Sequence, residues 1–161
     1  MKKEYLTKNP AETKEIGEIV AKILLKREKP RKKALVLALR GGLGSGKTTF
    51  VQGFAKGLGV KEKILSPTFV IFKKFKIKNN FFAYFYHIDC YRIKEAEELT
   101  GLGIKEMLAS PKSIIAVEWP EKIKPLIPKK SLNIKFTLKN EQERKIKLEN
   151  FPPETYNRIK L

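Results

Sequence analysis

The chain has 161 residues, a length that fits one domain with a single hydrophobic core. Hydrophobic residues make up 42% of it and charged residues 32%, which excludes a disordered chain, and no apolar run approaches the roughly 20 residues that would span a bilayer. The formal net charge of +18 attracts polyanions such as nucleic acid, or an acidic protein surface, unless the lysines only solvate the surface.

The first predicted helix begins near Asn9. Asn9 suits the N-cap, Pro10 the first helical position and Glu12 the third, from which its carboxylate can reach back to the cap. The apolar residues that follow at spacings of three and four form one stripe: Ile16, Ile19, Val20, Ile23 and Leu24. A basic run over residues 26–33 ends this helix.

A continuous apolar run over residues 34–39 predicts a strand that is buried on both faces. A glycine-rich loop over residues 41–46 follows. A second helix runs from there to about Leu58, where Gly59 can supply a left-handed C-cap.

The rest of the chain alternates strand-like runs with short helices. Residues 69–77 and 81–88 predict a β-hairpin with a short polar turn. Two helical patches, a second buried strand and a loop or short helix follow, over residues 94–99, 104–108, 113–118 and 120–128. Residues 131–139 and 144–148 alternate apolar and polar side chains and predict a closing antiparallel pair, after which we expect the last ten residues to be loosely ordered.

This order of elements predicts an α/β fold. We expect a P-loop NTPase-like mixed sheet with a parallel core, antiparallel edge strands and helices on both faces, in one domain over residues 1–161. The chain starts basic but turns polar where a secretory signal would turn apolar. The single cysteine, Cys90, has no partner for an internal disulfide, so both features indicate a cytoplasmic protein with no membrane association.

Residues 41–48 read GGLGSGKT and match the phosphate-loop pattern G-x-x-x-x-G-K-[ST] in full. Glycines let backbone N–H groups approach a phosphate closely, and the following helix adds its free N–H groups and the positive end of its dipole. Lys47 can reach the β- and γ-phosphates, and the Thr48 hydroxyl can ligate magnesium. A glycine-rich turn that binds nothing is the alternative, but the predicted strand before the loop and the helix after it favour an ATP site with Mg²⁺.

Two acids follow apolar strands, where the ligand crevice of an open α/β sheet lies. Asp89 follows residues 81–88 and Glu118 follows residues 114–117, so each is a candidate to hold magnesium or orient water. His87 is expected on the same strand face as Asp89, where it either orients Asp89 or a phosphate oxygen, or is a packed, hydrogen-bonded histidine. Thr68 lies in the connection that senses the γ-phosphate in many P-loop proteins, or else in an ordinary turn.

Five motifs in order, GGLGSGKTTF, SPTF, HIDCYR, EELTGLGI and VEWPE, together resemble the TsaE (YjeE) family. The resemblance runs over about residues 13–120, and the set is far more specific than the glycine-rich loop alone. Such proteins are small bacterial ATPases needed to make N6-threonylcarbamoyladenosine on tRNA. They act with the TsaD–TsaB pair, and their ATP hydrolysis is thought to reset that complex.

The resemblance also implies roles for single residues. The ATP phosphates would be bound by Gly44, Ser45, Gly46, Lys47, Thr48 and Thr49. Thr48 and Glu118 would be the magnesium ligands, with Lys47, Asp89 and Glu118 as the catalytic set. The backbone around Ala11 would lie near the adenine and Trp119 beside the site. The chain departs from the family at Gly42, where an acid is usual, and any water or magnesium contact of that acid would be lost.

Other functions stay open from the residues alone. A small-molecule kinase would carry an Arg-rich lid, and none is evident. A GTPase-like switch would need an N-K-x-D element, which the sequence lacks. A non-catalytic adaptor that uses ATP only for order is a third alternative. Arg40 and Arg92 are candidates for a charge-stabilising arginine, although each has a structural interpretation too, so we expect slow hydrolysis without partners. The net charge fits work near tRNA without showing direct contact.

Overall fold

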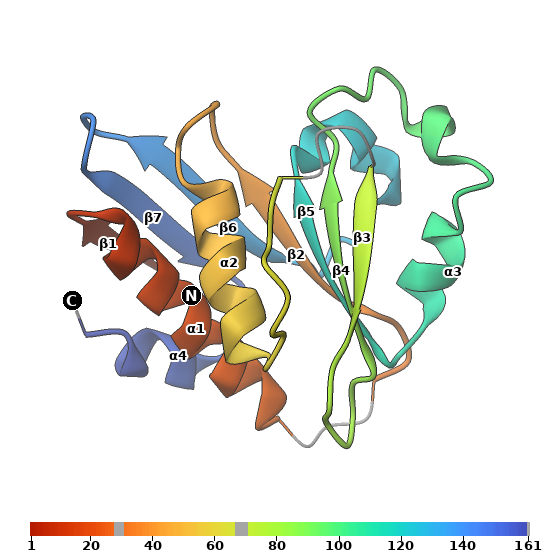
Figure 1. Cartoon of the computed structure of the whole chain (residues 1–161), viewed down its shortest axis with the longest axis horizontal. Coiled ribbons are helices and arrows are strands. Elements are labelled where there is room, and N and C mark those ends of the chain that lie inside the picture. Colours follow the sequence, from red (N-terminus) through yellow and green to blue (C-terminus); the bar gives the residue numbers. More distant parts are fainter. Residues whose placement is uncertain (28–30, 67–70, 161) are drawn as a thin grey trace.

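The computed structural model describes residues 1–27, 31–66 and 71–160. Its centre is a seven-stranded sheet with the strand order β1-β7-β6-β2-β5-β4-β3 (Figure 1). The strands are β1 Lys2–Thr7, β2 Leu35–Arg40, β3 Phe72–Lys76, β4 Tyr84–Asp89, β5 Ser113–Glu118, β6 Leu132–Leu138 and β7 Arg144–Glu149. β6, β2, β5 and β4 are mutually parallel, whereas β1, β7 and β3 pair antiparallel at the edges. The predicted parallel core with antiparallel edges is therefore confirmed.

Helices cover both faces of this sheet, as the sequence predicts. On one face lie α1 Pro10–Leu25, α2 Lys47–Gly57 and α4 Pro153–Arg158, which share a core with the side chains of β2 that point to that face (Figure 1). On the other lie α3 Ile104–Ala109 and the 3₁₀ helices η1 Ala96–Leu99 and η2 Pro120–Leu126. Side chains along the central strands point alternately into the two cores. Both faces of these strands are therefore buried, which explains the continuous apolar sequences of β2 and β5.

Glycines let α1 and α2 cross at very close range. A Cβ on Gly53 would lie 1.9 Å from the Lys14 carbonyl oxygen, and one on Gly17 would lie 2.3 Å from that of Phe50. Any larger residue there would force the helices apart, at a cost of about 1–3 kcal/mol or more. The close crossing seats the first turn of α1 beside the first turn of α2.

The predicted helix signals are confirmed. The Asn9 side chain accepts from the Glu12 amide at 2.9 Å, and Glu12 reaches back to the Lys8 amide at 2.7 Å, one residue before the cap. Gly59 follows α2 with φ of 81°, the left-handed conformation expected of a C-cap glycine. None of the helices in the described ranges combines the length and apolar character that a membrane crossing requires.

Both termini differ from the sequence interpretation. β1 was not predicted because only Tyr5 and Thr7 of its six residues are buried, which leaves little alternation to read. Residues 152–160 are not loosely ordered: they include α4, and Tyr156 and Ile159 lie in the core. The Tyr156 hydroxyl donates to the Met1 carbonyl oxygen at 2.8 Å, so the two ends of the chain stabilise each other.

Candidate active site

The glycine-rich loop connects β2 to α2 at the carboxyl edge of the parallel strands. Gly46 caps α2 with φ of 102°, a backbone conformation that side chains disfavour, and its carbonyl oxygen accepts from the Phe50 amide at 2.9 Å. A Cβ on Gly41 would lie 2.6 Å from the Phe136 carbonyl oxygen, so this position excludes larger residues as well. The first amides of α2 have no acceptor within the helix, which makes this turn a site for an anion.

A cavity of about 600 Å³ opens over this turn. Its walls come from the start of α1, the loop and α2, the ends of β4 and β5, and the β6–β7 turn. All six residues predicted to bind phosphate line it: Gly44, Ser45, Gly46, Lys47, Thr48 and Thr49. From α1, Pro10 and Thr13 line it, whereas Ala11 lines a separate groove between α1 and α2. The role of Ala11 stays a prediction, and its neighbours are better placed.

Lys47 is almost fully buried at the base of the cavity. Its ammonium group donates to the Gly41 and Gly42 carbonyl oxygens, each at 2.8 Å, and lies 4.4 Å from the centre of the Trp119 ring. Burial lowers the pKa of Lys47, and the nearby carboxylates of Glu118, Asp89 and Glu121 oppose that shift only in part. A cation held mainly by neutral carbonyl groups can exchange them for phosphate oxygens.

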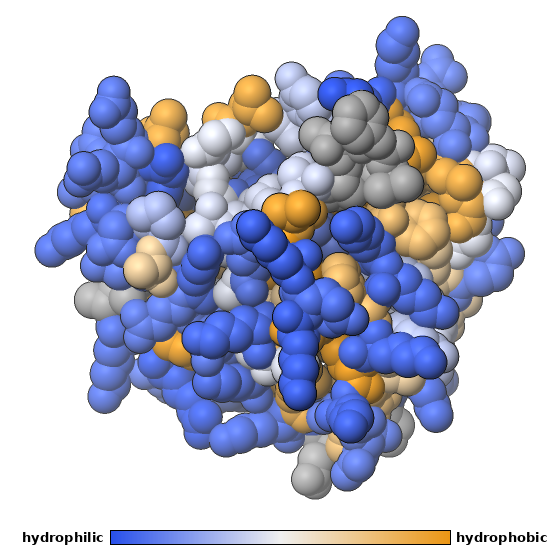
Figure 2. All heavy atoms as spheres, in the orientation of Figure 1, coloured by the Kyte–Doolittle hydropathy of each residue, from blue (hydrophilic) through white to orange (hydrophobic). Residues whose placement is uncertain are grey.

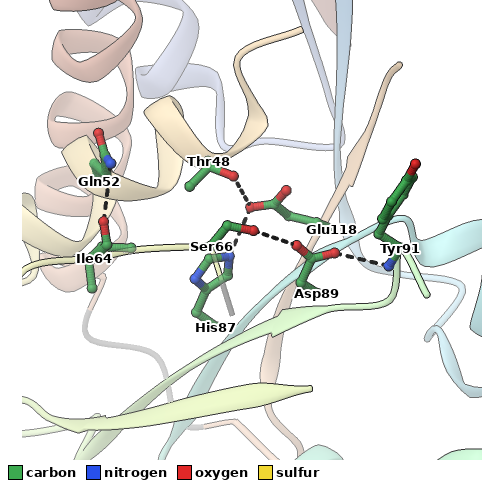
Figure 3. Close-up of polar contacts among 8 residues, drawn as sticks. All are labelled: Thr48, Gln52, Ile64, Ser66, His87, Asp89, Tyr91 and Glu118. Carbon is green, nitrogen blue, oxygen red and sulfur yellow. Dashed lines mark hydrogen bonds and ion pairs between the residues drawn. The ribbon is translucent and has the colours of Figure 1, made fainter. Parts of the chain in front are cut away.

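Glu118 ends β5 and contacts the helix that follows the loop. Because β5 is the neighbour of β2, its carboxylate meets the first turn of α2, and Oε1 accepts from the Thr48 hydroxyl at 2.9 Å (Figure 3). The same oxygen lies 2.9 Å from His87 Nε2, and both side chains are buried. Since an ionised carboxylate can only accept, His87 donates from Nε2.

The hydroxyl of Thr48 and the carboxylate of Glu118 are the hard oxygen donors that Mg²⁺ prefers. Within the described ranges, no group of three or more His, Cys, Asp or Glu side chains could hold a metal. Magnesium does not need one, since it usually takes one or two protein ligands together with water and substrate phosphates. The residues present therefore fit this ion.

Asp89 lies one strand further from the loop and has different partners. Its carboxylate accepts from the Ser66 hydroxyl at 2.9 Å and the Tyr91 amide at 3.0 Å (Figure 3). Ser66 belongs to the connection after α2, which Gln52 also ties by donating to the Ile64 carbonyl oxygen at 3.1 Å. Asp89 therefore lines the cavity and also holds this connection.

The structure decides between the two alternatives for His87. His87 lies on β4 in the expected register, but its partner is Glu118 rather than Asp89 or a phosphate oxygen. The alternative of a packed, hydrogen-bonded histidine is thus confirmed. Its Nδ1 is buried, with no hydrogen-bond partner in the part of the chain that the structure describes. Thr68 lies outside the described residues.

Trp119 lies beside the site as the family resemblance implies. Its φ of 58° is left-handed, which is rare for a bulky residue and is typical of functional sites. Its ring contacts that of Tyr91, with centroids 5.2 Å apart, and both residues line the cavity.

The two candidate arginines, Arg40 and Arg92, differ in their position relative to the cavity. Arg92 lines the cavity, whereas the Arg40 side chain donates to the Asn133 side chain and is absent from the lining in the described part of the chain. Sequence reasoning missed Arg144, which lines the cavity from the start of β7. Its Cγ lies 3.8 Å from where a Cβ on Gly46 would be. No local motif marks it, because it is brought there only by the pairing of β6 with β7.

Fold and site together define the class: a mixed α/β protein with a glycine-rich strand-to-helix loop and an acid on the neighbouring strand. A family model described as "Threonylcarbamoyl adenosine biosynthesis protein TsaE" matches residues 7–146. The chain therefore belongs to the TsaE family of threonylcarbamoyl adenosine biosynthesis proteins.

Individual relatives agree with this membership. The chain is similar to the tRNA threonylcarbamoyladenosine biosynthesis protein TsaE of Bacillus subtilis, with 36% identity over 89% of this chain and 82% of the relative. The TsaE protein of Haemophilus influenzae is also 36% identical, over 70% of this chain and 67% of the relative. Among solved structures, Bacillus subtilis YdiB aligns with a TM-score of 0.74 at 30% identity, covering 99% of this chain and 94% of that one.

Proposed function

We propose that this protein binds and hydrolyses ATP with Mg²⁺ in the biosynthesis of tRNA threonylcarbamoyladenosine, acting with the TsaD–TsaB pair. The observation that carries the ATPase proposal is the hydrogen bond of 2.9 Å between Thr48 and Glu118, next to the Lys47 ammonium group and the first turn of α2. It brings the two expected metal ligands together at the place where a triphosphate would lie over the loop. Family membership supports the pathway.

The protein's own groups suit hydrolysis. Lys47 neutralises charge on the β- and γ-phosphate oxygens, and the amides of the loop and α2 hold the phosphates in place. Thr48 and Glu118 supply oxygen ligands to magnesium, which when bound offsets the charge that develops on the phosphates. Asp89 links the site to the connection through Ser66 and is the second acid available to place water.

Turnover by the chain alone is expected to be slow. Of the cations that line the cavity, Arg92 and Arg144 are the candidates to stabilise charge in the transition state, and Arg144 is already engaged by donating to the Asn140 carbonyl oxygen at 3.0 Å. A partner that reorders this rim would complete the site. We therefore expect TsaD–TsaB to raise the hydrolysis rate.

The test combines binding and turnover. The single tryptophan, Trp119, lies against Lys47, so its fluorescence should change on titration with ATP and Mg²⁺ and change less with EDTA in place of Mg²⁺. Phosphate release should be slow with the chain alone and faster with TsaD–TsaB. An unchanged spectrum together with no calorimetric heat of ATP binding would refute the nucleotide assignment. Binding without hydrolysis in the presence of the pair would leave only the non-catalytic adaptor.

A further inference from the structure

Most of the positive charge comes from one part of the sequence. Residues 29–88 contain thirteen Lys and Arg residues and a single acid, Glu62, so this stretch supplies +12 of the net +18. A lysine-rich composition alone would spread the excess in proportion to length, yet the other 101 residues supply only +6. The question is where the fold puts this charge.

The fold places four of these thirteen cations, Arg31, Lys32, Lys33 and Lys78, at the end of the sheet opposite the glycine-rich loop. There the β3–β4 turn contacts the end of α1, since the Asn79 side chain donates to the Leu25 carbonyl oxygen at 3.4 Å (Figure 1). The Ala83 amide donates to the Lys112 carbonyl oxygen at 2.9 Å, which brings the start of β5 to the same edge. Six cations from these segments and from the residues that lead into β2 form what we call the basic end: Arg27, Arg31, Lys32, Lys33, Lys78 and Lys112.

Among the residues that the structure describes, the charges of the basic end are weakly compensated. Arg27 has an ion pair with Glu154, but at 3.8 Å and between exposed side chains such a pair contributes little. Arg31 donates to the Lys33 carbonyl oxygen at 3.4 Å, which is a neutral acceptor. Loss of solvent and then repulsion from Arg27 lower the pKa of Arg31. An anion bound between these groups would relieve that repulsion.

The surface chemistry distinguishes two kinds of acidic partner. Protein interfaces usually have an apolar or aromatic centre and few lysines, whereas nucleic-acid interfaces are rich in Lys and Arg. In the described ranges, the large apolar side chains that are exposed lie outside the segments of the basic end: Met1, Leu6, Leu43, Leu65, Tyr91, Leu102 and Leu138. Figure 2 shows hydrophilic side chains over much of the lower part of this face, with some apolar surface between them.

We propose that the basic end binds the phosphate backbone of RNA. It lies at the amino ends of β2, β5 and β4, whereas the cavity lies at their carboxyl ends, so RNA and nucleotide occupy opposite edges. This surface goes beyond the proposed ATPase function and does not depend on it, because its charges do not contribute to the cavity. Contact with tRNA then has a defined location on this chain.

The test measures binding of an unmodified tRNA transcript by fluorescence anisotropy, without nucleotide, over a series of salt concentrations. The triple variant Lys32→Gln/Lys33→Gln/Lys78→Gln removes three exposed charges of the basic end. The matched control Lys94→Gln/Lys105→Gln/Lys139→Gln removes three exposed charges elsewhere. Thermal unfolding of both variants checks that each is folded.

Affinity of the basic-end variant should fall about tenfold or more near 0.1 M salt, and its log–log salt slope should flatten by about 2. The control should stay within about twofold of the parent. Equal losses in the two variants, or no loss in either, would overturn the proposal. Poly-glutamate displacing the transcript at equal charge concentration would also overturn it, in favour of an acidic protein surface. Folded single variants Lys78→Glu and Lys32→Glu repeat the comparison if the triple variant is unstable.

Discussion

At the carboxyl edge of the parallel strands, Lys47 is buried, hydrogen-bonded to two carbonyl groups and close to three carboxylates. At the opposite edge, the lysines of the basic end are exposed. Among the described residues, the one ion pair of the basic end joins Arg27 to Glu154. The formal charge of each lysine is the same in both places. Under the two proposals, burial suits Lys47 to bind one group of phosphates, whereas the exposed cations of the basic end give a diffuse field that salt screens.

The largest effect should come from removing the buried cation. In Lys47→Met, ATP affinity should fall at least about 100-fold, because two or more charge-assisted hydrogen bonds to phosphate are lost. The melting temperature without nucleotide should rise by about 2–5 °C, since the cost of burying the ammonium group disappears. Calorimetric titration and thermal unfolding measure the two quantities, with Lys105→Met as the exposed control. If Lys47→Met bound ATP as tightly as the parent, the buried lysine would not be a specific phosphate ligand, and the proposed difference between the two edges would be wrong.

The variant Glu118→Gln should lose a comparable factor in its rate of ATP hydrolysis. The amide can still accept from Thr48 but is a poor magnesium ligand, so ATP hydrolysis should fall about 100-fold while ATP binding in EDTA stays unchanged. The exposed Glu97→Gln variant is the control. A Glu118→Gln enzyme as active as the parent in tRNA modification would mean that nucleotide serves only to order the protein.

The role of His87 should give an intermediate effect. His87→Phe removes one of two donors to a buried carboxylate, so the Mg²⁺ concentration that half-saturates hydrolysis should rise about tenfold at constant pH. His87→Gln retains a donor and should restore it to within about threefold. If both variants behave alike, the histidine only fills space beside Glu118.

The smallest effect concerns how well the fold excludes water from Cys90 at the carboxyl edge of the parallel strands. Cys90, next to Asp89, is fully buried, and burial followed by the charges of Asp89 and Glu121 raises its pKa to about 12 from 9.0. Native protein should therefore resist alkylation at pH 8, whereas unfolded protein reacts quickly. Because the folded state holds this proton more tightly, its contribution to stability is complete below pH 9 and is lost as pH rises through 12. Rapid labelling of the native thiol would show that water reaches this edge freely.

Much of the candidate active site was determined locally by the sequence. The loop and Lys47 and Thr48 are neighbours in the chain, and the geometry of a strand followed by a helix is enough to place them. Alternation along apolar runs also identified both acids at strand ends and set His87 and Asp89 on one face. The helix caps at Asn9 and Gly59 depend on the same short-range physics.

Only the tertiary structure decided which of these residues meet. Strand order makes β5 rather than β4 the neighbour of β2, so Glu118 instead of Asp89 accepts a hydrogen bond from Thr48. His87 is hydrogen-bonded to Glu118 for the same reason. The position of Arg144 at the cavity, the docking of α4 and the gathering of the basic end depend on contacts between segments far apart in the chain. The reason is that local patterns record which face a side chain takes, whereas its partners are set by the packing of the whole sheet and its two cores.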